Sequence, residues 1–252
     1  MGKAMRKLDI IDARPAYTQA DADALNQRFA GVDTLAMLRT LFAEGLLGHT
    51  AVVSSFGTES AVLLHLVAAA DRTVPVIFVD TLKMFPETLA YRETLVAAFG
   101  ITNSWTVEPD AAVIAAKDDK GLRWSYDPDG CCEIRKVEPL RRAKAGLDSW
   151  ISGRKAFQSV TRQNLPRFEV EDGRLKVNPL GDWNKADLES YFEAHDLPRH
   201  PLEAEGYLSI GCQPCTSKVQ PGEDPRAGRW RGWDKVECGI HVPADGADQP
   251  SF

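Results

Sequence analysis

The chain has few of the features that mark membrane, secreted or nucleic-acid-binding proteins. No stretch reaches the ~18 consecutive apolar residues that a membrane helix needs. The first residues, MGKAMRKLDIIDARP, contain no apolar segment of a secretory signal. The net charge of -6 argues against a general nucleic-acid binder, because such proteins carry a basic excess. We therefore expect a cytoplasmic protein whose partners include neither a membrane nor a nucleic acid.

Cysteine is also scarce, with five residues in 252. An odd count of this size argues against the disulfide framework of a secreted domain and favours metal or redox chemistry. Cys131 and Cys132 are adjacent. Neighbouring Cα atoms lie about 3.8 Å apart, whereas an unstrained disulfide needs about 5.5 Å. The two thiols are therefore expected to serve another purpose than pairing with each other.

The length and the 44% hydrophobic content allow one large or two small domains. Residues 1–45 carry two helical patterns, which we interpret as a helical N-terminal segment. Residues 46–205 are expected to form an α/β nucleotide-binding core that carries the cysteine pair. Residues 206–252 are rich in Gly, Pro, Arg and Trp without periodicity, which predicts an irregular C-terminal segment with a mobile tail.

The core region repeats a strand, loop and helix pattern. TAVVSSFGTESAVLLHLVAAA and VPVIFVDTLKMFPETLAYRETLVAAFG each begin with a buried strand and end with an apolar helix. RFEVEDGRLKV is typical of a hairpin that turns at Asp172 and Gly173. The fold class predicted is α/β, with a mostly parallel, doubly wound, Rossmann-like sheet and helices on both faces.

The stretch SSFGTES follows the first predicted strand, where open α/β sheets bind anionic ligands. Glycine there lets the backbone approach an oxyanion, and hydroxyl groups can donate to it. A capped strand-to-helix turn without a ligand remains the alternative. At the end of the next strand, Asp80 is a candidate partner for a ribose hydroxyl or an adenine amine. The candidate phosphate and nucleotide contacts are Ser54, Ser55, Gly57, Ser60, Asp80 and Thr81.

Four cysteines form a second pattern, a tandem pair followed by a C-x-x-C motif. They are Cys131, Cys132, Cys212 and Cys215. The C-x-x-C spacing lets two thiols point at one centre. Four thiolates can hold a structural zinc ion or an iron-sulfur cluster, and the spacing alone leaves both open. A thioredoxin-like redox motif is less favoured, because Cys212 and Cys215 do not lie between an early strand and helix.

The fifth cysteine, Cys238, lies in DKVECGIH near the C-terminus. Its polar, Gly-flanked segment argues against a core position. The surrounding cationic residues, which include Arg226 and Arg229, favour the reactive thiolate. Cys238 is therefore a candidate nucleophile, and an idle exposed thiol is the alternative.

Five motifs carry a resemblance to a known family: SSFGTES, FVDTLKMFPET, CCEIRKVEPL, GCQPCT and ECGIH. In order and spacing they resemble those of the assimilatory sulfonucleotide reductases, the adenylyl-sulfate and phosphoadenylyl-sulfate reductases. The resemblance implies a fold of the adenine nucleotide alpha-hydrolase type and a 4Fe-4S cluster on the four cysteines. It also implies thioredoxin-dependent reduction of adenosine 5'-phosphosulfate, with Cys238 as nucleophile.

The resemblance implies further substrate contacts, which are Lys136, Arg162, Arg226, Arg229 and His241. The chain departs from the related ATP pyrophosphatase loop S-G-G-x-D-S, because Phe56 and Glu59 replace Gly and Asp. This departure argues against ATP cleavage.

Three alternatives follow from the sequence. A phosphoadenylyl-sulfate reductase or a dual-substrate enzyme would share every motif. A zinc-stabilised binding module would use the same four cysteines without needing Cys238. The sequence leaves homo-oligomer formation open.

Overall fold

The structure is a computed structural model that describes residues 16–158, 165–235 and 237–239. One six-stranded sheet, in the order β3-β2-β1-β4-β6-β5, forms its centre. All neighbouring strands are parallel except the pair β5 and β6. The strands are β1 (Thr50–Val53), β2 (Val76–Val79), β3 (Ser104–Val107), β4 (Ser149–Ser152), β5 (Phe168–Glu171) and β6 (Arg174–Val177). The predicted mostly parallel, doubly wound sheet is confirmed.

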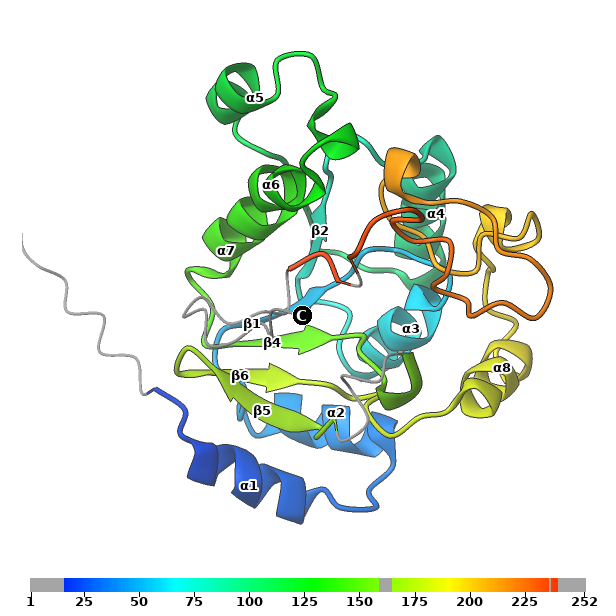
Figure 1. Cartoon of the computed structure of the whole chain (residues 1–252). Helices are drawn as coiled ribbons and strands as arrows, with labels where there is room; N and C mark the ends of the chain where they lie inside the picture. The colour runs from blue at the N-terminus through cyan, green and yellow to red at the C-terminus, as the bar shows by residue number, and fades with distance from the viewer. Residues whose placement is uncertain (1–15, 159–164, 236, 240–252) are drawn as a thin grey trace, which may run out of the picture.

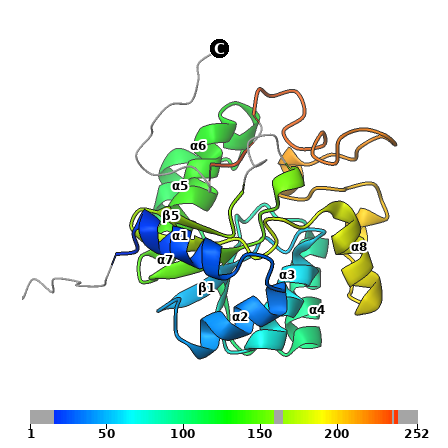
Figure 2. The same cartoon turned by 90° about the horizontal axis from the view of Figure 1, so that it is seen from below.

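Helices cover both faces of the sheet. Figure 2 shows α2, α3 and α4 together on one side and α5, α6 and α7 on the other. The α-helices are α1 (Gln19–Arg28), α2 (Thr34–Ala43), α3 (Ser60–Ala70), α4 (Pro86–Phe99), α5 (Ala111–Lys117), α6 (Pro128–Cys132), α7 (Glu138–Lys144) and α8 (Lys185–Ala194). None of the helices in the described ranges is long and apolar enough to cross a membrane.

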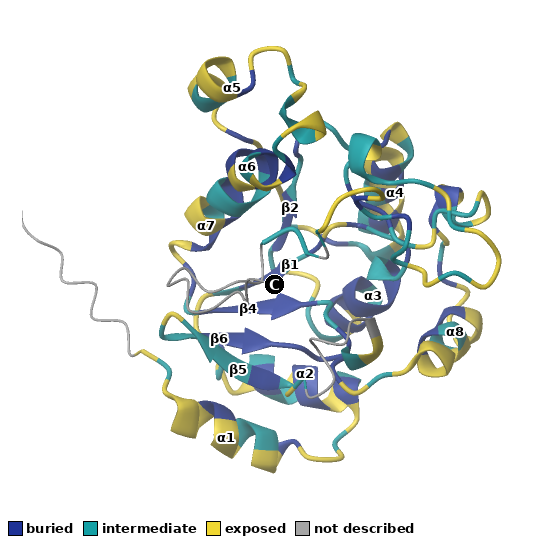
Figure 3. Ribbon diagram, in the orientation of Figure 1, coloured by how far each residue is buried: buried dark blue, intermediate teal, exposed yellow. Residues whose placement is uncertain are grey.

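The apolar side chains of each strand alternate between the two faces, as the period of a strand requires. Val52 and Ile151 join the larger core beneath α2, α3 and α4. Ala51 and Trp150 join the smaller core beneath α7. Figure 3 shows the buried residues gathered on the strands and on the sheet-facing sides of the helices.

Several local signals in the sequence produce the expected geometry. Asp33 is the N-cap of α2, and its carboxylate accepts from the Ala36 N–H at 3.0 Å. The predicted hairpin turns at Asp172 and Gly173, whose φ angles of 53° and 69° lie in the left-handed region. A tight turn with two such residues matches the twist of the flanking strands.

Residues 206–235 fold back over the carboxyl ends of the strands, next to the beginning of α4 (Figure 1). Residues 206–235 contain one short 3-10 helix, η6 (Gln213–Cys215), and two isolated bridges. One bridge pairs Cys212 with Met84, and the other pairs Thr216 with Arg229. The segment is therefore irregular but is held to the sheet edge and to itself.

Candidate active site

The predicted phosphate loop leaves β1 and enters α3. Phe56 has a φ of 50°, and its ring is fully buried edge-on against Phe78 at 5.5 Å. A non-glycine residue in the left-handed region stores strain that the buried ring holds in place. The side chain of the N-cap residue Glu59 makes no capping hydrogen bond within the described structure. The positive N-terminal end of α3 is thus open to an anion.

A cavity of about 540 Å³ lies at this end of the sheet. Its volume is in the range of small-molecule sites. It lies between the carboxyl ends of the neighbouring strands β1 and β4, where the strand order reverses, which is the usual ligand position in open α/β sheets. The predicted residues that line it are Ser54, Ser55, Gly57, Ser60, Lys136, Arg226, Arg229 and Cys238.

The structure does not bring Asp80 and Thr81 to this cavity. The Asp80 carboxylate accepts from the Leu82 N–H at 2.8 Å and so closes a local turn. Thr81 is fully buried, and its Oγ1 lies 3.2 Å from the Cys212 Sγ. Two further candidates, Arg162 and His241, lie outside the described residues.

The first cysteine pair ends a short helix. Asp127 caps α6 by accepting from the Gly130 N–H at 2.8 Å, and a Cβ on Gly130 would overlap that carboxylate. Cys131 and Cys132 are buried at the C-terminal end of α6. A π-helical turn, η2 (Glu133–Val137), follows directly and leads into α7. Such turns are rare and are frequent at functional sites.

The second pair lies opposite, in the C-terminal segment. The Gln213 N–H donates to the Lys83 carbonyl at 2.8 Å, which fixes the start of η6. All five cysteines are described, and all are free thiols. The four cysteines of the two pairs line one small cavity of about 10 Å³, together with Arg135, Lys136 and Trp230. The predicted grouping of Cys131, Cys132, Cys212 and Cys215 is thus present in space.

The thiols of this group differ in acidity. Burial raises the pKa of Cys131 to about 12 and that of Cys132 to about 11. Burial also raises the pKa of Cys212. The Lys136 ammonium and the hydrogen bond with the Thr81 hydroxyl together outweigh this effect, so the pKa of this thiol is lowered. A bound cation would therefore have to displace protons from most of the set, as metal binding by cysteine does.

The donor set fits an iron-sulfur cluster. Soft thiolates are its usual ligands, and a cluster takes one thiolate at each iron. A tetrahedral zinc ion instead requires its ligands to converge on one point. Within the described ranges, no three His, Cys, Asp or Glu side chains are grouped to hold a single metal ion. The four cysteines line one shared cavity, and their soft thiols are of the donor type that a cluster takes.

Three residues line both cavities: Lys136, Arg229 and Trp230. The guanidinium of Arg229 lies over the Trp230 ring at 4.4 Å and donates to the Ile210 carbonyl at 3.2 Å. A Cβ on Gly211 would overlap the guanidinium, so the glycine leaves room for Arg229 in this position. The cysteine group and the larger cavity thus share a cationic wall.

Cys238 lies at the larger cavity and is the one cysteine among its described lining residues. Two ion pairs made by residues just before Cys238 fasten this part of the chain. Glu237 pairs with Arg226 at 3.3 Å, and Lys235 pairs with Asp129 of α6. The thiol is therefore brought to the cationic end of the cavity, close to the first cysteine pair.

Sequence reasoning missed four cationic residues that line the cavity, Arg154, Lys155, Lys185 and Arg199, of which the first two closely follow β4. Lys155 pairs with Glu59 at 2.9 Å, and Arg154 pairs with Glu169 at 2.6 Å. The available signal was the run Gly-Arg-Lys directly after the strand Ser149–Ser152, at the carboxyl end of a parallel strand.

An open α/β sheet with an anion-favouring crevice, and a thiol at that crevice, is typical of nucleotide-binding enzymes. Residues 49–218 match the family model of the phosphoadenosine phosphosulfate reductase domain. The chain therefore belongs to the phosphoadenosine phosphosulfate reductase family, the sulfonucleotide reductases. The resemblance carried by its motifs is confirmed.

Relatives define the branch of the family. The adenosine 5'-phosphosulfate reductase of Mesorhizobium japonicum is 48% identical over 94% of this chain and 93% of its own length. That of Chelativorans sp. is 49% identical over 78% and 80%. A crystal structure of phosphoadenylyl-sulfate reductase from Candida auris, in a phosphate complex, matches with a TM-score of 0.68 and 28% identity over 81% of this chain and 98% of that one. The chain is thus an oxidoreductase of the adenylyl-sulfate reductase type.

Proposed function

We propose that the protein reduces adenosine 5'-phosphosulfate to sulfite and AMP, in sulfate assimilation for cysteine biosynthesis in the cytoplasm. One observation carries the proposal. Cys238 shares a cavity of about 540 Å³ with Ser54, Ser55, Gly57 and Ser60 of the loop after β1 and with three cations, Lys136, Arg226 and Arg229. A nucleophile, an anion-binding loop and a cationic wall are what an attack on an activated sulfate requires.

The reaction begins with attack of the Cys238 thiolate on the sulfur of the substrate. The bond between that sulfur and the bridging oxygen breaks, and AMP leaves as a stabilised phosphate anion. The enzyme then carries an S-sulfocysteine. Positioning and charge neutralisation are the main demands of this step. Arg226 and Arg229 meet them, since guanidinium groups bind phosphate and sulfate oxygens through two parallel donors.

The second half of the reaction regenerates the Cys238 thiol. A thiolate of reduced thioredoxin attacks the Cys238 sulfur and expels sulfite, which leaves a mixed disulfide. The second thioredoxin thiol attacks that disulfide, so that Cys238 is regenerated and thioredoxin departs oxidised. Cys238 is only partly buried, so a thiol of a second protein can reach its sulfur from outside, as this step requires.

Cys131, Cys132, Cys212 and Cys215 would hold a 4Fe-4S cluster. When bound, the cluster supplies a compact charged group beside the substrate cavity. Lys136 lines both the larger cavity and the cysteine cavity. Burial lowers its pKa, but the Cys212 and Cys238 thiols raise it above the ordinary value. Its ammonium therefore stays charged and can neutralise the sulfate oxygens near Cys238.

The test uses anaerobically purified protein and two matched variants. The wild type is expected to be brown, to contain iron and to release sulfite from adenosine 5'-phosphosulfate with reduced thioredoxin. Cys238→Ser should retain iron and release no sulfite, whereas Cys215→Ser should lose iron. Without thioredoxin, the wild type should gain the mass of one SO₃ group, and Cys238→Ser should not.

Two results would sink the proposal. Sulfite release by Cys238→Ser would remove this residue as nucleophile. A colourless wild type that holds zinc and releases no sulfite would favour the binding-module alternative. Faster turnover with the 3'-phosphorylated nucleotide would keep the mechanism and change the substrate.

A further inference from the structure

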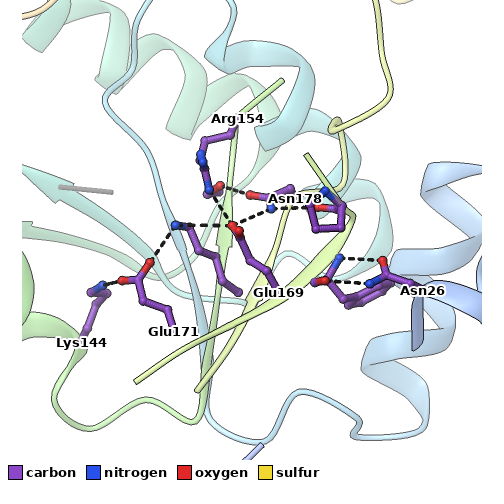
Figure 4. Close-up of polar contacts among 10 residues, drawn as sticks. Asn26, Lys144, Arg154, Glu169, Glu171 and Asn178 are labelled. Carbon is purple, nitrogen blue, oxygen red and sulfur yellow. Dashed lines mark hydrogen bonds and ion pairs between the residues drawn. The ribbon is translucent and has the colours of Figure 1, made fainter. Parts of the chain in front are cut away.

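A chain of buried charges runs from α7 through β5 and β6 to the wall of the larger cavity (Figure 4). The Lys144 Nζ lies 3.1 Å from the Glu171 Oε1, and the Lys176 Nζ lies 2.8 Å from the Glu171 Oε2. Lys176 also lies 3.5 Å from the Glu169 Oε1, and that oxygen accepts from the Arg154 Nη1 at 2.6 Å. The chain thus ends at Arg154.

Among the described residues, the charges in this chain do not balance. Three cations, Lys144, Lys176 and Arg154, share the two carboxylates of Glu169 and Glu171. The exposed fractions of the three cationic side chains are 11%, 2% and 14%. An uncompensated charge at such depth is unfavourable. Of the three, Arg154 is the one that lines the cavity, so an anion in the cavity would restore the balance there.

The Arg154 side chain is held in place, and it is the Nη1 that donates to Glu169. The Glu169 Oε1 also accepts from the Asn178 Nδ2 at 3.0 Å, and the Asn178 Oδ1 accepts from the Ser152 Oγ at 2.6 Å. These bonds fix the carboxylate that orients Arg154. The Arg154 Nε is buried without a hydrogen-bond partner in the described part of the chain. A guanidinium can bind a carboxylate through one side and an anion through its other donors.

Arg154 also lies beside the phosphate loop. β1 and β4 are parallel neighbours, with Val53 opposite Ser152 in the register. Ser54 and Gly153 therefore leave the sheet side by side, and both line the cavity. Arg154 directly follows Gly153 in the sequence and also lines the cavity. An anion at the open end of α3 would lie within the same crevice.

We propose that Arg154 is a substrate-binding residue that contacts a phosphate oxygen of the bound nucleotide, and that Glu169 is its positioning residue. The inference rests on the proposed function, because it takes an adenosine nucleotide as the ligand. It adds a phosphate contact on the β4 side of the cavity. The phosphate is the 5'-phosphate of the nucleotide or a 3'-phosphate, and the ligands used in the test distinguish them.

The test is nucleotide binding by calorimetry with the holoenzyme. The ligands are adenosine, AMP and adenosine 3',5'-bisphosphate. Arg154→Gln, whose amide can still bond Glu169, should weaken binding of a phosphate-bearing ligand about 10- to 100-fold, the range of a charge-assisted hydrogen bond. Adenosine should bind as it does to the wild type. Equal losses for AMP and the bisphosphate assign the 5'-phosphate, and a loss confined to the bisphosphate assigns the 3'-phosphate.

Arg167→Gln is the matched control. The Arg167 side chain is 15% exposed and pairs with Asp182 at 2.9 Å, which resembles Arg154 in burial and pairing, but it does not line the cavity. This variant should bind all three ligands as the wild type does. Arg154→Lys keeps the charge without the forked donors and should show an intermediate loss, which tests the inference should Arg154→Gln fold poorly.

Two outcomes overturn the inference and leave the proposed function standing. The first is unchanged binding of both phosphate-bearing ligands by Arg154→Gln. The second is an equal loss for adenosine, which would indicate a general disturbance of the cavity. A wild type that binds none of the three ligands would overturn the proposed function and this inference together.

Discussion

The buried pair of Asp118 and Arg135 should be among the interactions whose loss is most damaging to this protein. The Arg135 Nε and Nη2 donate to the Asp118 Oδ2 at 2.9 and 2.7 Å, and the two side chains are 5% and 1% exposed. The other carboxylate oxygen accepts from the Arg123 N–H at 2.8 Å. Asp118→Ala would leave a buried guanidinium and a backbone N–H without their acceptor. Breaking one partner of a buried pair costs about 3–5 kcal/mol, and we expect a loss of unfolding free energy in that range.

The same change should reach the cysteine cavity. Arg135 belongs to the π-helical turn that follows Cys132, and its Nη1 donates to the Thr81 carbonyl at 2.9 Å. The Thr81 hydroxyl in turn contacts the Cys212 thiol at 3.2 Å. We therefore expect iron content to fall in Asp118→Ala along with stability.

The assay is urea unfolding followed by tryptophan fluorescence, with iron measured on the same samples. The double variant Asp118→Ala/Arg135→Met should be more stable than Asp118→Ala, because it removes the uncompensated charge as well. Glu44→Ala is the control. Glu44 pairs with Arg28 at 2.6 Å, but both side chains are 45% exposed. This exposed pair should contribute little, since water screens it. A loss below about 1 kcal/mol in Asp118→Ala, or strict additivity in the double variant, would refute the reasoning.

Two further predictions follow from burial and close contact. Burial raises the pKa of Glu171, but the Lys176 and Lys144 ammonium groups lower it below its ordinary 4.5. Its contribution is therefore present above that value and lost as pH falls through the lowered pKa. Glu171→Gln should be less stable than the wild type at pH 7, and its unfolding free energy should fall less steeply as the pH is lowered. Equal slopes of unfolding free energy against pH in the two proteins would contradict this. A Cβ at residue 228 would overlap the Ser217 carbonyl, so Gly228→Ala should shift the segment that carries Arg226 and raise the KM for the nucleotide. Gly146→Ala, which meets open space, is its control, and an unchanged KM in Gly228→Ala would argue against that placement of the segment.

The fold could be predicted where each element is specified by residues close in sequence. The N-cap Asp33 and the turn at Asp172 and Gly173 form from contacts within four residues, and both are confirmed. The order of the strands depends on crossovers and not on local pattern. The neighbourhood of β1 and β4 joins residues about 100 positions apart, and no residue in either strand signals it.

The same limit separates the residues found in the candidate site from those missed. The cysteines and arginines near the C-terminus can be recognised as candidate site residues from the sequence, because a polar, irregular segment offers them few structural roles. Asp80 and Thr81 follow a strand, as ligand residues do. The Asp80 carboxylate, however, accepts from the Leu82 N–H in a local turn, and the Thr81 hydroxyl contacts the Cys212 thiol. Arg154 also follows a strand. Its orientation depends on Glu169, which lies on a different strand of the sheet.

The two cavities are coupled because they share side chains from two distant parts of the chain. Lys136 comes from the π-helical turn after the first cysteine pair, and Arg229 comes from the C-terminal segment. The Trp230 N–H donates to the Cys215 carbonyl at 3.0 Å, so the cysteine that would hold the cluster also holds the arginine segment. A displacement of Cys215 would therefore move Arg229 and its neighbours before it moved the sheet. On the proposed mechanism, the cysteines need not take part in the sulfur chemistry to be required for it, since they fix the cationic wall beside Cys238.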